Sequence, residues 1–355
     1  MRLRPRTLGL AAALAISSAV VAGAAPATAA PDVELKAASV GRVYGADRIG
    51  TAVAASKSFT GGQAKAVVLA RADDYADSLA AAPLASDLGG PLLLTGSGSL
   101  DPAVSAAISD VLVQGGTVYL LGGEKALSAN VGTQVRALGK VGDVRRVAGG
   151  DRFGTAVEIA KLLPTAKSVA VVTGWNFPDG LSAGALMGVV DVDTDHSIGV
   201  VLLSDGRSLG RTTSDYLAGR TFTNKLAIGG DARTAVAGDT SGWVPLVGSD
   251  RYDTSARVAA TFTSDSFFTD ATTIVGVATG EGWADALSGS ALLAYGGGPL
   301  LLTARDGLPS STTGALKALQ ADAKKNGETV EQALVFGGPN VVGTAVDGQI
   351  GSALQ

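Results

Sequence analysis

The chain has 355 residues, of which 46% are hydrophobic, 17% are charged and 5% are aromatic, and it contains no cysteine and a single histidine, His196. A composition this apolar excludes a disordered protein, and the absence of cysteine excludes disulfides, thiol nucleophiles and cysteine-bound zinc. The formal net charge of −4 disfavours a nucleic-acid partner, because nucleic-acid-binding domains usually carry a strong basic excess.

Residues 1–29 have the three-part pattern of a secretory signal peptide. Three arginines precede an apolar run over 8–23, small residues follow at 27–29, and we expect cleavage after Ala29. The apolar run is too short for a membrane anchor, and no second hydrophobic span follows it. We therefore expect a secreted protein on the cell wall or cell surface, with no membrane anchor in the mature chain.

Four sequence blocks recur in the same order three times after the signal peptide. They are an Asp-Arg block, an Asp-x-Leu block, an apolar run that ends in a hydroxyl residue, and an apolar residue followed by Gly-Gly. The repeated polar residues are Asp47, Arg48, Asp77 and Thr95 in the first copy, Asp151, Arg152, Asp179 and Ser204 in the second, and Asp250, Arg251, Asp285 and Thr303 in the third. The sequence predicts three similar units, at 40–145, 146–245 and 246–355.

Within the first unit, short apolar runs alternate with amphipathic stretches. The runs at 66–70, 91–95 and 118–121 are typical of strands buried on both faces of a parallel sheet. Helical spacing follows at 77–88 and 101–112, and Asp101 before Pro102 is a strong helix start. We expect an α/β fold in which each unit is a small parallel sheet flanked by helices.

Small residues dominate two of the expected helices, at 80–82 and 182–185. Such faces allow helix backbones to approach closely, within one unit or between units. Three similar units can close around a threefold axis, so we expect a pseudo-threefold, triangular assembly.

The repeated polar residues follow the ends of the expected strands, where ligands bind in open parallel sheets. They are therefore candidate ligand-binding residues. Purely structural roles are also open: Asp77 and its copies could cap helices, Asp47 and Arg48 could form an ion pair, and Gly-Gly could only supply a tight turn.

The sequence gives weaker support to an enzymatic activity or to cofactor binding. The Gly-Gly turns match neither a dinucleotide fingerprint nor a phosphate loop, and no cofactor is expected. Asp47 with Asp77 is a formal carboxylate pair for glycoside hydrolysis, but a catalytic site normally specialises one copy of a repeat. The acidic insertion at 191–196, which includes His196, lacks the remainder of a calcium-binding loop; a solvated loop and a metal site both stay open, and we expect no metal.

The blocks Gly-x-Asp-Arg-x-x-Thr-Ala, Asp-x-Leu-Ser/Ala, Pro-Leu-Leu-Leu-Thr and apolar-Gly-Gly, in three tandem copies, closely resemble the cell wall-binding repeat type 2 family of Gram-positive surface proteins. The resemblance covers the chain from about residue 40 to its end. It implies three α/β modules in a triangle that bind anionic cell-wall polysaccharide non-covalently, without catalysis. Two alternatives are an accessory factor for a wall hydrolase and a carboxylate-dependent wall hydrolase.

The second and third copies depart from the family pattern. Gly199 replaces the proline of the apolar block, and Ser249 replaces a glycine of the Asp-Arg block. The three inter-module surfaces are therefore not expected to be equivalent. We expect the arginines at 48, 152 and 251 to supply local positive charge on an otherwise acidic protein.

Overall fold

A computed structural model describes residues 38–59, 62–189, 198–263 and 271–355. The expected signal peptide and the acidic insertion at 191–196 lie outside these residues. Within the described part of the chain, no helix combines the length and the apolar character needed to cross a bilayer.

The described residues form three four-stranded parallel sheets, which confirms the predicted α/β class. The first sheet has the order β3-β2-β4-β5, the second β7-β6-β8-β9 and the third β1-β12-β10-β11. Their strands are β2 (Ala64–Arg71), β3 (Leu92–Thr95), β4 (Leu112–Leu121) and β5 (Val141–Val147); β6 (Ser168–Thr173), β7 (Val200–Ser204), β8 (Asn224–Ile228) and β9 (Trp243–Leu246); and β1 (Ser39–Val43), β10 (Ile274–Thr279), β11 (Leu300–Thr303) and β12 (Gln332–Phe336).

The outer strand of each sheet leads directly into the Asp-Arg block of a repeat. β5 precedes Asp151 and pairs with β4, and β9 precedes Asp250 and pairs with β8, so both strands cross the predicted unit boundaries at 145/146 and 245/246. β1 opens the first repeat and pairs with β12 near the end of the chain, so that Val43 lies opposite Phe336. The sequence repeat and the sheet are therefore offset by one strand, and the offset closes the three units into a ring.

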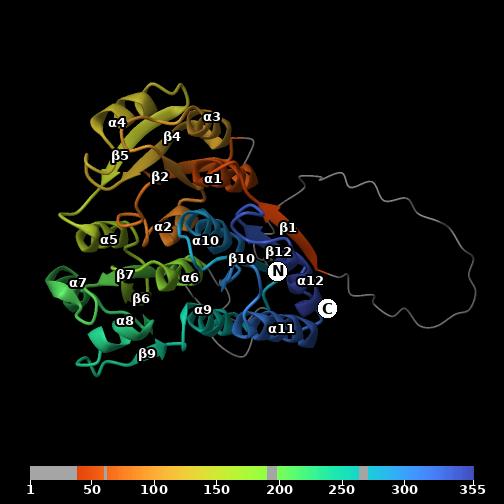
Figure 1. The fold of residues 1–355 in the computed structure, drawn as a ribbon. Helices are drawn as coiled ribbons and strands as arrows, with labels where there is room; N and C mark the ends of the chain where they lie inside the picture. The colour runs from red at the N-terminus through yellow and green to blue at the C-terminus, as the bar shows by residue number, and fades with distance from the viewer. Residues whose placement is uncertain (1–37, 60–61, 190–197, 264–270) are drawn as a thin grey trace, which may run out of the picture.

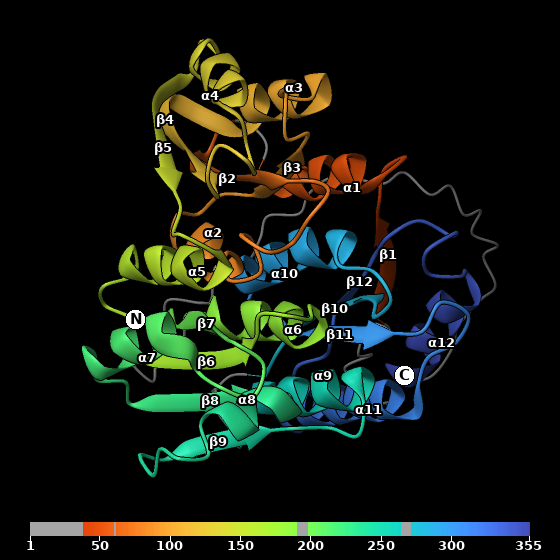
Figure 2. The same ribbon diagram turned by 60° about the vertical axis from the view of Figure 1, so that its left-hand side comes forward.

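Three helices meet at the centre of the molecule, α2 (Ala82–Asp87), α6 (Pro178–Met187) and α10 (Ala284–Gly296), with the three sheets around them (Figures 1 and 2). The remaining helices are α1 (Arg48–Ser56), α3 (Pro102–Val111), α4 (Ala129–Arg136), α5 (Arg152–Lys161), α7 (Gly210–Ala218), α8 (Gly230–Ala235), α9 (Arg251–Ala259), α11 (Ser310–Lys325) and α12 (Ala345–Ala353), with short 3₁₀ helices at Lys57–Phe59 and Ala260–Phe262. This arrangement confirms the expected pseudo-threefold architecture.

Small residues bring the central helices together, as the sequence predicts. A Cβ atom on Gly184 of α6 would lie 2.7 Å from the Ser290 hydroxyl of α10 and 3.0 Å from the Cβ of Ala82 in α2. The same Ser290 hydroxyl donates a hydrogen bond of 2.8 Å to the carbonyl of Leu181. No larger side chain than glycine fits at position 184 without moving its neighbours.

One predicted helix start is confirmed and one predicted helix is shorter than expected. Asp101 caps α3, its carboxylate accepting a 2.8 Å hydrogen bond from the amide of Ala103, and Pro102 occupies the first turn. The helix predicted over 77–88 begins only at Ala82. Turns occupy residues 76–80, so Asp77 lies before the helix.

Candidate ligand-binding edges

The repeated polar residues gather at the carboxyl ends of the strands, and each such edge combines two repeats. At the first sheet, Asp77 follows β2 and Thr95 ends β3, while Asp151 and Arg152 follow β5. The residues that the sequence places in one unit are therefore divided between two neighbouring edges. The candidate sites lie between repeats for this reason.

The first aspartate of each repeat caps a helix. The carboxylates of Asp47, Asp151 and Asp250 each accept a 2.8 Å hydrogen bond from a backbone amide in the first turn of α1, α5 and α9 respectively. All three aspartates are exposed. Within the described residues none of them forms an ion pair with the arginine that follows, so the ion-pair interpretation of Asp47 and Arg48 is wrong: the carboxylate binds the helix end instead.

The arginine of each repeat bridges two repeats. Its guanidinium donates to a carbonyl just after the second strand of its own repeat: Arg48 to Ala72 at 2.9 Å, Arg152 to Gly174 at 2.8 Å, and Arg251 to Gly280. The guanidinium also lies near an aromatic side chain of the repeat that precedes it in the closed assembly. The distance from the guanidinium carbon to the ring centre is 5.5 Å for Arg48 and Trp283, 5.9 Å for Arg152 and Tyr75, and 5.9 Å for Arg251 and Phe177. These contacts hold each guanidinium at a defined place on the edge.

The three aromatic residues form a cluster where the repeats meet. The ring of Tyr75 lies 5.7 Å from that of Phe177 and 6.1 Å from that of Trp283. The sequence reasoning missed these residues, although each precedes the repeated aspartate by two positions. Differing residue types hid the pattern, because a tyrosine, a phenylalanine and a tryptophan share only an aromatic ring.

The second aspartate of each repeat is not a helix cap. The caps of α6 and α10 are Phe177 and Trp283, and Asp179 and Asp285 lie inside the first turn. The carboxylate of Asp77 instead accepts a 2.7 Å hydrogen bond from the hydroxyl of Thr155 in the next repeat. The sequence could not separate these roles, because both place an aspartate near a helix start.

Burial changes the acidity of two of these carboxyls. It raises the pKa of Asp179 to about 6, an effect that the nearby Arg251 partly offsets. It also raises the pKa of Asp285, against the opposing influence of the Thr51 hydroxyl and of Arg48. The negative charge of Asp47 also raises the pKa of Asp285, which places Asp47 at the edge of the third sheet.

The carboxylate pair of Asp47 and Asp77, a candidate for hydrolysis, is not assembled. Asp47 follows β1, which belongs to the third sheet, whereas Asp77 follows β2 of the first sheet and is engaged by Thr155. The sequence suggested the pair because both residues fall in one repeat. The exchange of the outer strand separates them.

The first glycine of each Gly-Gly pair makes room for the second aspartate. Gly122, Gly229 and Gly337 all have positive φ angles, of 85°, 90° and 111°. A Cβ atom would lie 2.4 Å from the carboxylate of Asp77 at Gly122, and 2.0 Å from that of Asp179 at Gly229. The turn expected from Gly-Gly is therefore present, and it also accommodates a side chain that the sequence did not connect to it.

The hydroxyl residues that end the apolar blocks lie inside the protein. Thr95, Ser204 and Thr303 have no exposed surface. The Ser204 hydroxyl donates to the carbonyl of Gly206 at 2.8 Å, and that of Thr95 accepts a 2.8 Å hydrogen bond from the amide of Asp101. The structure thus places these three candidates at the buried ends of β3, β7 and β11, where they bond the adjoining loops and do not face solvent.

One residue makes the three edges chemically different. After the carbonyl that binds the arginine, the first repeat has Asp73, the second Trp175 and the third Glu281. Trp175 is 58% exposed, and its ring centre lies 4.7 Å from the guanidinium of Arg152. A hydrogen bond from Arg71 lowers the pKa of Asp73 to about 2, so this carboxylate is charged at neutral pH. Only the edge at Arg152 has a neutral aromatic residue at this position.

Taken together, the sheets and their edges define a ring of three similar α/β modules with charged, aromatic-backed surfaces between them. Among the described residues, no group of three or more histidine or acidic side chains is arranged to hold a metal ion. The chain belongs to the family described as Cell wall binding domain 2, which it matches three times, over residues 42–132, 146–236 and 246–347. It is therefore a cell wall-binding protein of three tandem repeats.

Similar proteins agree with this family. The chain is 26% identical to N-acetylmuramoyl-L-alanine amidase LytC of Bacillus subtilis (strain 168), over 88% of its own length and 58% of the amidase, and 30% identical to the amidase enhancer of the same organism, over 40% and 19%. Among solved structures, Cwp8 from Clostridium difficile has a TM-score of 0.72 at 27% identity, covering 89% of this chain and 51% of Cwp8. Cwp6 from the same organism has a similar fold, with a TM-score of 0.74 at 21% identity over 95% of this chain and 51% of Cwp6. The chain thus spans about half to three-fifths of the proteins it matches over most of its own length.

Proposed function

We propose that this protein is secreted and binds non-covalently to an anionic polysaccharide of the cell wall through the three arginine-bearing edges, without catalysing a reaction. The observation that carries the proposal is the fixed position of each guanidinium between a carbonyl of its own repeat and an aromatic ring of a neighbour. Arginine presents five N–H donors in a planar fork that suits carboxylate and phosphate groups. In the described residues, each of the three guanidiniums donates through one nitrogen, Nη1, to one carbonyl.

The acidity of the whole protein is compatible with an anionic ligand because the contact is local. The formal net charge is −4 for the full chain, yet the residues aligned on each edge include a guanidinium supported by an aromatic face. A hydrogen-bonded guanidinium and a phosphate or carboxylate interact at short range, where the pair outweighs a screened background charge.

We further propose that the Arg152 edge contributes most to binding. Asp73 and Glu281 place a carboxylate at the positions that correspond to Trp175, and these charges oppose an anionic ligand near Arg48 and Arg251. At Arg152, the corresponding residue is Trp175, whose exposed indole offers a flat surface for a sugar ring and donates a 2.7 Å hydrogen bond to the carboxylate of Asp205.

A pull-down on purified cell wall tests the proposal. The mature protein should sediment with the wall, and chemical removal of the anionic polysaccharide should abolish this binding. Raising the salt concentration should weaken it, because the contacts are ionic. Unchanged binding to walls stripped of the polysaccharide would show that another wall polymer is the ligand.

Single substitutions test the contribution of each edge. We expect Arg152→Gln to weaken wall binding more than Arg48→Gln or Arg251→Gln. Arg211→Gln is a matched control, because the Arg211 side chain is 94% exposed on α7 and lies outside the repeated blocks. Equal losses for the three edge variants would refute the ranking, and no loss in the triple variant would refute the role of the arginines.

A second candidate function is that of an accessory factor for a wall hydrolase. The similarity to an amidase and to an amidase enhancer, each matched over part of its length, favours this possibility. The protein should then change the rate at which a purified wall amidase clears a cell-wall suspension. An unchanged rate at saturating protein would count against an accessory role and would leave wall binding itself unaffected.

A further inference from the structure

The outer strand of the second sheet lacks an arginine that both other sheets have. Arg42 in β1 and Arg146 in β5 lie five positions before the capping aspartates Asp47 and Asp151. Five positions before Asp250, in β9, the chain has Pro245 instead. This difference follows from aligning the repeats on their capping aspartates.

The two arginines fill the space between the outer strand and the segment that follows the preceding strand in the sheet. Arg42 is almost buried and forms two 2.8 Å hydrogen bonds with the carboxylate of Asp347, as well as bonds to the carbonyls of Gly337, Val342 and Gly343. Arg146 donates to the carbonyls of Gly122 and Leu127 at 2.8 and 2.7 Å. In both sheets a guanidinium ties the loop before the last helix to the outer strand.

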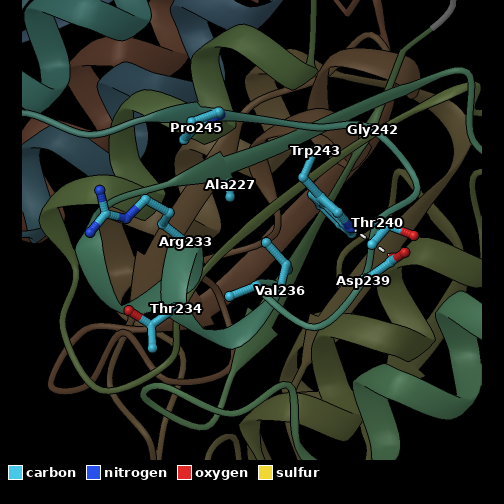
Figure 3. A pocket seen from close by; sticks show the side chains of 10 residues that line it. Ala227, Arg233, Thr234, Val236, Asp239, Thr240, Gly242, Trp243 and Pro245 are labelled. Carbon is cyan, nitrogen blue, oxygen red and sulfur yellow. Dashed lines mark hydrogen bonds between the residues drawn. The ribbon is translucent and has the colours of Figure 1, made fainter.

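The second sheet has neither the arginine nor the loop that the arginine binds. α8 begins at Gly230, directly after β8 ends at Ile228, whereas α4 begins at Ala129, well after the end of β4 at Leu121. A hollow of about 510 Å³ remains between α8 and β9 (Figure 3). Its volume lies within the range of ordinary small-molecule sites.

The hollow has an aromatic end, an apolar middle and a cationic end. Trp243 lies at one end, and its indole N–H donates a 2.8 Å hydrogen bond to Asp239, which fixes the ring. Val236 and Ala227 lie between this ring and Arg233, whose guanidinium is at the opposite end (Figure 3). Hydrogen bonds from Ser241 and Trp243 lower the pKa of Asp239 to about 2, so the carboxylate stays ionised and accepts the indole hydrogen bond at any physiological pH.

We propose that this hollow is a second binding site, specific to the second repeat, for an acidic sugar residue. The apolar face of the sugar ring would pack on Trp243, and its carboxylate or phosphate would pair with Arg233, which is exposed and lies at the opposite end of the hollow from the charged Asp239. The hydroxyls of Thr234 and Thr240 line the same hollow and provide partners for the ring hydroxyls. This site is lined by other residues than the arginine edges and does not depend on the function proposed for them.

Tryptophan fluorescence and NMR titration with glucuronic acid, and with glucose as its neutral counterpart, test this proposal on the full mature protein. We expect glucuronic acid to perturb Trp243 and to bind at least tenfold more weakly to Pro245→Arg, which installs the residue that fills the same space in the other sheets. Arg233→Gln should remove the preference for glucuronic acid over glucose, whereas Arg211→Gln should preserve it.

Three results would overturn the proposal: no binding of glucuronic acid, equal affinities of the parent protein and Pro245→Arg, or equal affinities for glucuronic acid and glucose. Circular dichroism establishes that each variant is folded. If Pro245→Arg does not fold, Trp243→Leu serves in its place, with the same expected loss followed by NMR. Wall pull-down of either variant separates the two sites, because the arginine edges are intact in both.

Discussion

Thr155 of the second repeat donates a 2.7 Å hydrogen bond to the carboxylate of Asp77 in the first repeat, 78 positions earlier in the chain. The same Thr155 hydroxyl accepts a 3.1 Å hydrogen bond from the amide of Gly149. One side chain thus joins the segment after β2 to the first turn of α5 across the boundary between two repeats.

Thr155→Val should destabilise the protein, since it keeps the shape of the side chain but leaves a carboxylate and an amide without this partner. We expect the free energy of unfolding to fall by about 2 kcal/mol, as for a lost hydrogen bond to a charged group. Urea denaturation measures it. Thr133→Val on α4 is the control, because that exposed hydroxyl only bonds its own helix. An effect no larger than that of the control would mean that the bond contributes nothing to stability.

Asp179 should make stability depend on pH. Burial raises its pKa from 3.8 to about 6, so the folded protein holds this proton more tightly than the unfolded chain does. The protonated Asp179 carboxyl therefore contributes its full stabilisation below the pKa of the unfolded chain, and this stabilisation is lost as the pH rises through the folded pKa. The free energy of unfolding falls by about 3 kcal/mol at most over this range.

Asp179→Asn should remove this dependence. We expect the variant to be about 1 to 3 kcal/mol more stable than the parent at pH 7, with a flatter stability profile between about pH 4 and pH 6. Thermal unfolding across this pH range measures the profile, and Asp215→Asn, at a site with a 71% exposed side chain, is the control. A variant with the profile of the parent would show that Asp179 does not titrate in this range.

Arg146 and Arg145 are adjacent in β5 but should respond very differently to substitution by methionine. Arg146 donates to two loop carbonyls, and Arg146→Met should lower the free energy of unfolding by about 2 to 4 kcal/mol. Arg145 pairs with Asp143 on the surface, and Arg145→Met should leave stability unchanged within error. Chemical denaturation of the two variants compares them directly, and equal effects would contradict the assigned role of Arg146.

Gly184 and Gly314 should give effects of opposite sign. Gly184→Val would push against Ser290 and Ala82 at the centre of the molecule, and we expect a loss of about 2 to 3 kcal/mol. Gly314 is exposed within α11, and a Cβ atom added there would meet no other atom within 4 Å, so Gly314→Ala should stabilise by about 0.5 to 1 kcal/mol. A tolerated Gly184→Val would show that the central helices can separate.

The local pattern of the sequence predicts the α/β class, three repeats and the helix start at Asp101, because these depend on periodicity and on neighbouring residues. The exchange of the outer strand was not predictable in this way. Nothing near Val43 indicates whether its strand pairs inside its own repeat or with Phe336, since both arrangements bury the same apolar residues. The roles of Asp77 and Tyr75 follow from that exchange and were hidden with it.

The unequal chemistry of the edges was partly visible in the sequence. Gly199 indicated that the repeats differ, whereas Ser249 does not mark a departure, because Gly248 keeps the glycine of the block and position 249 is the variable one; neither residue creates the differences that matter most. Trp175 and Pro245 create those differences. The role of Trp175 became clear only from its contact with the guanidinium of Arg152. The role of Pro245 became clear only from the space that Arg146 fills at the equivalent place in the first sheet.

The pairing of β1 with β12 has a consequence for the order of folding. Ser39 lies opposite Gln332, and Arg42 binds Asp347, so β1 is synthesised long before the residues that it pairs with. The first two sheets can form before β12 is synthesised, but the third is complete only after β12 has emerged. Such distant pairing slows folding, and it leaves β1 as an open strand edge until the ring closes.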